Sequence, residues 1–346
     1  MSTRRLGNTG IQVSALGLGG WTIGGPFRGG TDEWGYGPVD DRESIQAIQR
    51  AVDLGVTFFD TAANYGAGHS ERILGKALGS HRSSVVIATK FGYRVLDDQK
   101  LVDGPEVYQE AIRRSCEASL RRLGTEYIDL FQFHVGDHPA DQVDDVLDTL
   151  ESLVAEGHIR AYGWSTDDPV RARAFTAGKH CAAIQHQLNI FEDNPEMLRL
   201  CEKIGIASIN RGPLAMGLLT GKYARGARFD STDIRGANVP WMKYFQNGQP
   251  NPEWLARLEQ VKDILTSQGR TLAQGALAWL WAHSPVTLPI PGFRTVAQAE
   301  ENARALKFGP LTPRQMQEID RILGREDFRA PSSGNEAESA RGGSAA

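Results

Sequence analysis

The sequence predicts an α/β protein, a (β/α)8 barrel that forms a single domain over residues 1–325, with long βα loops at the C-terminal mouth of the strands. Eight short apolar or β-branched runs alternate along the chain with longer segments whose apolar residues recur at helical spacing. The runs are nearly continuous in apolar residues, which is typical of parallel strands covered by helices. A length of 346 residues suits one such barrel.

The predicted strands are spread over the whole chain and cover residues 13–18, 56–60, 85–90, 128–134, 159–165, 182–187, 206–210 and 286–290. Two clear helices lie over 108–123 and 143–154, each with an apolar face and a glycine soon after its end. An open doubly wound sheet is disfavoured, because residues 17–22 (GLGGWT) lack the third glycine of the dinucleotide fingerprint and no helix follows.

Glycine is the one unusual component, with 38 residues and no repeating period. Many of these glycines fall at strand–loop junctions, and a second group lies in the segment 24–37. That segment and residues 222–252 have no clear period, and we interpret both as loops over the active mouth. Residues 326–346 are polar and small, so we predict a disordered tail there.

Charge and composition exclude several classes of function. A net charge of −4 without a basic block argues against nucleic-acid binding, and no apolar run approaches the roughly 18 residues of a membrane span. The N-terminal sequence has no signal-peptide core, so we expect a cytoplasmic protein. Cys116, Cys181 and Cys201 are too few and too far apart for a disulfide scaffold, and we predict no metal site.

Ionisable residues gather at the C-terminal ends of neighbouring strands, where the loops of a barrel converge. Asp60 ends the second predicted strand and Tyr65 lies in the loop after it, while Lys90 and His134 end the third and fourth strands. Lys90 would lower the pKa of Tyr65 and make it a better proton donor, and Asp60 would pair with Lys90. His134 would donate to a carbonyl oxygen. The set suits protonation of an oxyanion as hydride reaches the carbon.

Each of these residues also has an ordinary structural interpretation. Asp60 alone could cap the segment after it, and Tyr65 alone could be a packed loop aromatic. His186 is interpreted as a satisfied interior histidine. The lid residues Trp241 and Tyr244, with Phe245 beside them, could equally pack the loop or wall a substrate pocket.

Five segments along the chain form a pattern in a fixed order: FFDTAANYGAGHSERILGKAL (58–78), VVIATKFG (85–92), YIDLFQFH (127–134), PLAMGLLTGKY (213–223) and PIPGFRTVAQAEENARAL (289–306). With these segments, the chain resembles the aldo-keto reductase superfamily over about residues 4–323. The resemblance implies a (β/α)8 barrel that binds NADPH/NADP+ without a Rossmann fold. It also implies a catalytic tetrad of Asp60, Tyr65, Lys90 and His134, with Tyr65 as the acid.

The resemblance further implies a set of cofactor-binding residues. Ser165 and Gln185 match the residues that hold the nicotinamide carboxamide, and Arg294 matches a position that can pair with a 2′-phosphate, which favours NADPH over NADH. The other matched positions are Gly20, Trp21, Arg211, Pro213, Leu214, Gly217, Lys222, Gly292, Gln298, Glu301 and Asn302.

Two positions depart from the pattern of the family. Thr166 stands where Asn is usual, and a threonine cannot make a two-pronged amide contact. Arg211 stands where the family often has an aromatic ring under the nicotinamide. A guanidinium stacked there would disfavour the positively charged ring of NADP+, so we hypothesise a shifted cofactor potential or an unusual ring orientation.

The sequence therefore predicts an NADPH-dependent oxidoreductase that reduces aldehydes or ketones, or acts in reverse on sugar-like alcohols. A slow-turnover, cofactor-sensing regulatory subunit of the same fold is the alternative. A hydrolase would need paired carboxylates at the mouth, where only Asp60 clearly qualifies. The expected partner is a small carbonyl or sugar-like molecule, and both a monomer and an oligomer are compatible with the sequence.

Overall fold

A parallel sheet of eight strands forms the centre of the computed structural model, which describes residues 2–325. In sheet order the strands are β16 (Thr287–Pro289), β13 (Ala207–Arg211), β12 (Cys181–Gln187), β11 (Ile159–Ser165), β10 (Ile128–Phe133), β7 (Val86–Phe91), β6 (Phe58–Asp60) and β3 (Gly17–Gly19). Gly19 closes the ring through a parallel bridge to Gly292, and its N–H donates to the Pro291 carbonyl at 3.0 Å. The predicted (β/α)8 barrel is confirmed, whereas the predicted tail at 326–346 lies outside the described residues.

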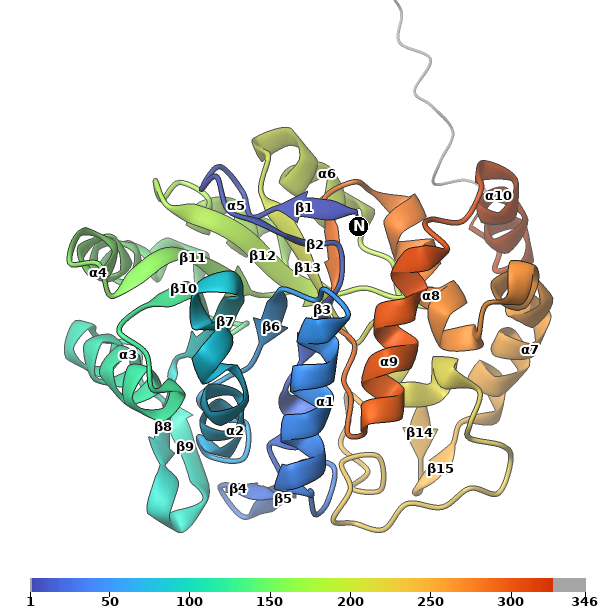
Figure 1. Ribbon diagram of the computed structural model, residues 1–346, viewed down its shortest axis with the longest axis horizontal. Helices are drawn as coiled ribbons and strands as arrows, with labels where there is room; N and C mark the ends of the chain where they lie inside the picture. The colour runs from blue at the N-terminus through green and yellow to red at the C-terminus, as the bar shows by residue number, and fades with distance from the viewer. Residues whose placement is uncertain (1, 326–346) are drawn as a thin grey trace, which may run out of the picture.

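Helices surround the barrel (Figure 1). They are α1 (Asp41–Asp53), α2 (His69–Leu78), α3 (Gln109–Leu123), α4 (Asp144–Ala155), α5 (Pro169–Phe175), α6 (Pro195–Ile204), α7 (Pro252–Thr266), α8 (Leu272–His283), α9 (Val296–Arg304) and α10 (Pro313–Ile322). The two helices predicted most clearly are α3 and α4, and Gly124 ends α3 with a φ of +65°. Within the described residues, no helix is long and apolar enough to cross a membrane.

Two apolar layers hold the barrel together. Because successive strand residues point to opposite faces, one set fills the interior and includes Phe58, Leu130 and Leu288. A larger set, including Trp164 and Trp279, packs between the strands and the surrounding helices. The functional groups are therefore confined to the strand ends and loops.

The first predicted strand, 13–18, divides into two. β1 (Thr3–Arg5) and β2 (Gln12–Ser14) form an antiparallel hairpin, and the barrel strand β3 starts only at Gly17. The bend follows Ser14, whose hydroxyl donates to the Leu16 carbonyl at 2.6 Å. In the view of Figure 1 this hairpin lies at the top of the molecule, and the long loops lie at the bottom.

The loops at the active mouth contain short strands that were not predicted. β4 (Phe27–Gly29), β5 (Asp32–Trp34), β8 (Tyr93–Leu96) and β9 (Leu101–Pro105) form one small sheet, and β14 (Phe245–Gln246) pairs with β15 (Gln249–Pro250). The two long segments also bind each other, since the Ile234 N–H donates to the Gly35 carbonyl at 2.8 Å. Backbone pairing therefore holds both predicted loops in place over the mouth.

Candidate active site

A cavity of about 1160 Å³ lies at the C-terminal ends of the barrel strands. The predicted site residues that line it are Asp60, Tyr65, His134, Trp21, Ser165, Gln185, Arg211, Pro213, Leu214, Gly217, Lys222, Gly292, Arg294, Gln298, Glu301 and Asn302. Lys90 and Gly20 lie just behind this lining. The barrel thus brings residues from segments far apart in the chain around one space.

The Lys90 ammonium is the centre of the buried polar cluster. Its Nζ donates to Asp60 Oδ1 at 2.5 Å, to the Thr61 carbonyl at 2.9 Å and to the Tyr65 hydroxyl at 3.1 Å. Parallel pairing of β6 with β7 sets Asp60 and Lys90 at adjacent strand ends. All three hydrogens of the ammonium are therefore used, which offsets the cost of burying the charge.

Asp60 is held from its other side by two amides. Gln132 Nε2 donates to Asp60 Oδ2 at 2.9 Å, and Gln185 Nε2 donates to the same oxygen at 2.8 Å. Gln132 was not among the predicted site residues. Its signal in the sequence is a lone amide between two aromatic residues, Phe131 and Phe133, in a buried strand.

The pKa of Tyr65 is shifted in the direction opposite to the predicted one. Burial raises this pKa, and the nearby Lys90 charge, which lowers it, is the second influence. The expected lowering by Lys90 is present but smaller than the effect of burial. Tyr65 is therefore a neutral phenol at neutral pH, with its hydroxyl oxygen against a cation that would stabilise the phenolate.

His134 faces Tyr65 across the cavity floor. The two rings meet edge to face with centroids 6.0 Å apart, and Tyr93 meets the other side of the imidazole in the same way. Burial, and then the charges of Lys90 and Arg211, hold the pKa of His134 well below its usual value. A neutral imidazole keeps one N–H donor, which suits the predicted contact with a carbonyl oxygen.

Cationic side chains from other segments of the chain also line the cavity. Arg294 and Lys222 were predicted there, and Arg235 from the long lid joins them in the lining. Arg235 pairs with Asp233 and lies 4.2 Å from the Phe229 ring centroid. The resemblance did not include this residue, because only the folding of the lid brings it back to the barrel.

Arg294 and the start of α9 are already bound within the protein. The Arg294 guanidinium donates to the carbonyls of Tyr36, at 2.8 Å, and Pro38. The Val296 N–H, in the first turn of α9, donates to Glu43 Oε1 at 2.8 Å. A 2′-phosphate would therefore meet a guanidinium that is already oriented, whereas the Val296 N–H already donates to Glu43 and is not free to bind the phosphate.

The remaining predicted cofactor residues have clear structural neighbours. The Gly20 N–H donates to the Asp60 carbonyl at 2.7 Å, so the first loop is attached directly to the end of β6. Asn302 Nδ2 donates to the Gly292 carbonyl at 3.3 Å. Gly217 has a φ of +96°, a backbone conformation that a side chain would strain.

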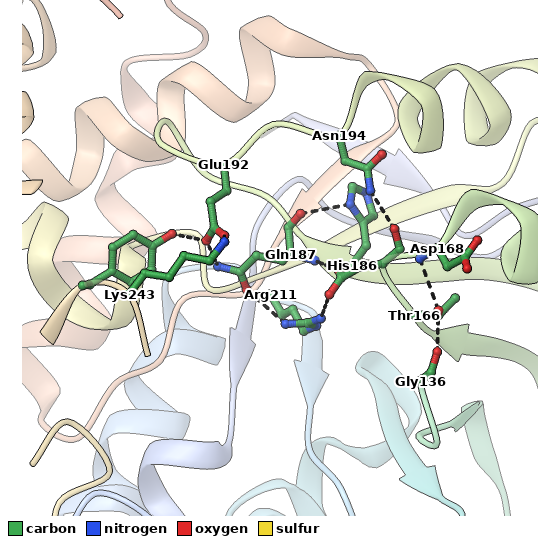
Figure 2. Close-up of polar contacts among 11 residues, drawn as sticks. Gly136, Thr166, Asp168, His186, Gln187, Glu192, Asn194, Arg211 and Lys243 are labelled. Carbon is green, nitrogen blue, oxygen red and sulfur yellow. Dashed lines mark hydrogen bonds and ion pairs between the residues drawn. The ribbon is translucent and has the colours of Figure 1, made fainter. Parts of the chain in front are cut away.

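Both departures from the family pattern take part in polar contacts. Thr166 Oγ1 donates to the Gly136 carbonyl at 2.8 Å and accepts from the Asp168 N–H at 3.3 Å (Figure 2). Arg211 forms an ion pair with Asp167, and its Nη1 donates to Gln187 Oε1 at 3.1 Å. Arg211 is thus not the isolated cation that the sequence suggested, because a carboxylate balances it.

Tryptophans form a wall above Tyr65. The Trp21 and Tyr65 rings stack with centroids 6.0 Å apart, and Trp241 lies between Trp21 and Trp34, 6.3 Å from each. Trp241 is 45% exposed and lines the cavity, as Tyr244 does, whereas Phe245 is buried outside the lining. The lid therefore contributes both to the pocket wall and to loop packing.

His186 carries a testable pH dependence of stability. Burial lowers its pKa from 6.5 to about 4, and its Nε2 is 2.8 Å from Ser208 Oγ. The unfolded chain takes up this proton below pH 6.5 and the folded chain does not, so stability should fall by roughly 3 kcal/mol as the pH drops from 6.5 to 4. Denaturant unfolding across this range should show a smaller loss in His186→Gln.

The matched control is His158→Gln, because that side chain is 45% exposed. It should keep a slope close to that of the parent chain. An unchanged slope in His186→Gln would assign the acid sensitivity to other groups.

Within the part of the chain that the structure describes, no group of three or more His, Cys, Asp or Glu side chains is arranged to hold a metal ion.

Comparison with known proteins agrees with this geometry. The profile of the Aldo/keto reductase family matches residues 15–324. The aldo-keto reductase YhdN of Bacillus subtilis (strain 168) is 32% identical over 306 residues, which cover 87% of each chain.

Two solved structures share the fold and the family. The glycerol dehydrogenase AKR11B4 from Gluconobacter oxydans has a TM-score of 0.78 and 32% identity, and the match covers 97% of this chain and 99% of that one. An aldo/keto reductase from Klebsiella pneumoniae, in complex with NADP and acetate, has a TM-score of 0.66 and 25% identity, with 93% and 96% covered. Because the family profile spans nearly the whole chain and the solved relatives share its barrel, this protein belongs to the aldo/keto reductase family.

Proposed function

We propose that this protein is an NADPH-dependent oxidoreductase that reduces an aldehyde or ketone to an alcohol, with Tyr65 as the proton donor. The observation that carries the proposal is the buried Asp60–Lys90–Tyr65 cluster, which opens with His134 into a cavity large enough for a dinucleotide and a small substrate. The NADP-bound relative from Klebsiella pneumoniae supports the choice of cofactor. A cytoplasmic location stays a prediction.

The residues around the cavity fit NADPH. Arg294, Arg235 and Lys222 supply positive charge at one end, where phosphates would lie. At the other end, both hydrogens of Gln185 Nε2 are donated, to Asp60 and to Gln132 Oε1 at 3.2 Å. Its Oε1 remains an acceptor for a carboxamide N–H, with Ser165 beside it in the cavity lining.

When bound, the cofactor supplies a hydride to the carbonyl carbon. His134 would donate its N–H to the carbonyl oxygen and hold it beside the Tyr65 hydroxyl. Tyr65 would transfer its proton to that oxygen as negative charge develops there. Lys90 would stabilise the resulting phenolate, and Asp60 would keep the ammonium in place until Tyr65 regains a proton from water.

The pocket walls favour a small, oxygen-bearing substrate. Trp21, Trp34 and Trp241 offer flat apolar faces, and the opposite wall is polar. This combination of apolar and polar walls agrees with hydroxylated aldehydes, ketones or, in the reverse direction, sugar-like alcohols.

The direct test is to follow loss of NADPH absorbance with a panel of aldehydes, ketones and sugars, using the purified protein. Steady turnover of at least one carbonyl is expected. Tight NADPH binding without turnover of any member would contradict catalysis and support the cofactor-sensing alternative.

Arg294 should carry the preference for the phosphorylated cofactor. Because a guanidinium forms charge-assisted bonds to a phosphate, Arg294→Gln should weaken NADPH binding about 10-fold or more, and NADH binding far less. Fluorescence titration with both cofactors measures the two dissociation constants. Arg304→Gln, an exposed arginine on α9 that pairs with Glu300, is the matched control. Equal weakening of both cofactors would place the 2′-phosphate elsewhere.

A further inference from the structure

The structure assigns a role to a residue that no motif marks. We propose that Asp167 neutralises and orients Arg211 beside the cofactor ring, and so sets the relative affinity of the site for the oxidised and reduced cofactor. The proposal rests on the proposed function, because it concerns the charge difference between NADP+ and NADPH.

Three adjacent strand ends bring the group together. Asp167 follows β11, Gln187 ends β12 and Arg211 ends β13, and these strands are neighbours in the sheet. Arg211 Nη2 pairs with Asp167 Oδ2, and Nη1 donates to Gln187 Oε1 at 3.1 Å. Figure 2 shows the hydrogen bond between Arg211 and Gln187.

Asp167 is itself fixed in position. Its Oδ1 accepts the Gln187 N–H at 2.7 Å, and its carbonyl accepts from Asn194 Nδ2 at 3.0 Å. Gln187 is held in turn, since its Nε2 donates to Glu192 Oε2 at 3.1 Å. The acceptors therefore bind the guanidinium at its edge, in its own plane, which leaves a face of this planar group available to a flat ring.

The pair belongs to the cavity wall and not to the outer surface alone. Asp167, Gln187 and Arg211 all line the cavity, and the side chains of Arg211 and Asp167 are 38% and 52% exposed. Gln185, two residues before Gln187 on the same strand, bonds to the catalytic Asp60 at 2.8 Å. A nicotinamide whose carboxamide meets Gln185 would therefore lie between the tetrad and Arg211.

The charge of Arg211 reaches the catalytic groups. It is among the influences that lower the pKa of both Tyr65 and His134. A lone cation at this place would repel the positive ring of NADP+ and leave the neutral ring of NADPH unaffected. The Asp167 carboxylate cancels most of that repulsion, so the proposed shift in cofactor potential is expected only when Asp167 is removed.

The test is a pair of opposite charge changes. Fluorescence titration gives the dissociation constants for NADPH and NADP+ in the parent chain, Asp167→Asn, Arg211→Gln and the double variant. Asp167→Asn should weaken NADP+ about 5- to 20-fold relative to NADPH, a size expected for one unpaired charge near a partly exposed site. Arg211→Gln should move the same ratio in the opposite direction, and the double variant should return it close to the parent value.

Asp168→Asn is the matched control. Asp168 accepts from the Val170 N–H at 2.8 Å as the cap of α5, and an asparagine keeps that role. Its removal changes the net charge by the same amount one residue away, and the ratio should stay at the parent value.

The outcomes separate this proposal from the proposed function. If the parent chain binds neither NADPH nor NADP+, the proposed function fails and this inference fails with it. If both bind and the ratio is the same in all variants, the role of Asp167 is wrong while the proposed function stands. If Asp167→Asn does not fold, Arg211→Gln still decides, because a ratio that fails to shift toward NADP+ overturns the proposal.

Discussion

Tyr65→Phe should lose turnover by about 10³-fold and bind NADPH nearly as well as the parent chain. The substitution removes the phenol hydroxyl, whose oxygen accepts from Lys90 Nζ at 3.1 Å, and leaves the ring stacked on Trp21. In the proposed function the hydroxyl donates the proton and does not hold the cofactor, so kcat should fall while the cofactor dissociation constant changes little. Steady-state kinetics with the best carbonyl of the panel and fluorescence titration measure the two quantities.

The matched control is Tyr127→Phe. That ring lies between Arg82 and Arg160, outside the cavity lining, and its contacts to them are made by its faces. Turnover should stay near the parent value in the control. If Tyr65→Phe retained a tenth or more of the parent kcat, the proton would have to come from another group.

Lys90→Met should lose both turnover and stability. It removes the partner of a carboxylate that is 2% exposed, and an unpaired buried charge costs about 3–5 kcal/mol. The amides of Gln132 and Gln185 still donate to Asp60 Oδ2, so the loss should lie toward the lower end of that range. Urea unfolding at neutral pH measures it.

The double variant Lys90→Met/Asp60→Asn tests the physical reason. With both charges removed, no unpaired charge is buried, so much of the lost stability should return while turnover stays low. Lys262→Met is the control, because its pair with Glu259 is exposed and should contribute at most about 1 kcal/mol. A cost below 1 kcal/mol for Lys90→Met would show that Asp60 needs no cation.

The strands, and the clustering of Asp60, Tyr65, Lys90 and His134, could be predicted because both depend on short-range sequence pattern. Apolar runs mark the strand positions, and in parallel strands the residue after each run must emerge at the same edge of the barrel. Asp60, Lys90 and His134 needed only that rule to be placed together. The lid strands β4, β5, β14 and β15 could not be predicted, since each is only two or three residues long and too short to show apolar alternation.

Electrostatic balance was also outside the reach of the sequence. The pKa of Tyr65 depends on how deeply the ring is buried, and this outweighs the neighbouring Lys90 charge that the sequence does reveal. Arg211 stood out as a cation in an unusual place, but its partner Asp167 is 44 residues away and meets it only at the barrel mouth. Arg235 likewise reaches the cavity only when the lid folds back over the barrel mouth.

The sequence by itself therefore determined the barrel, the order of its strands along the chain and the four groups that lie together at its C-terminal mouth. It could do so because the alternation of apolar runs and the strand-end rule depend on local spacing. Only the tertiary structure decided which charges are neutralised, which phenol stays protonated and which lid residues face the cavity. Burial and ion pairing depend on distances between segments that the chain brings together only when it folds.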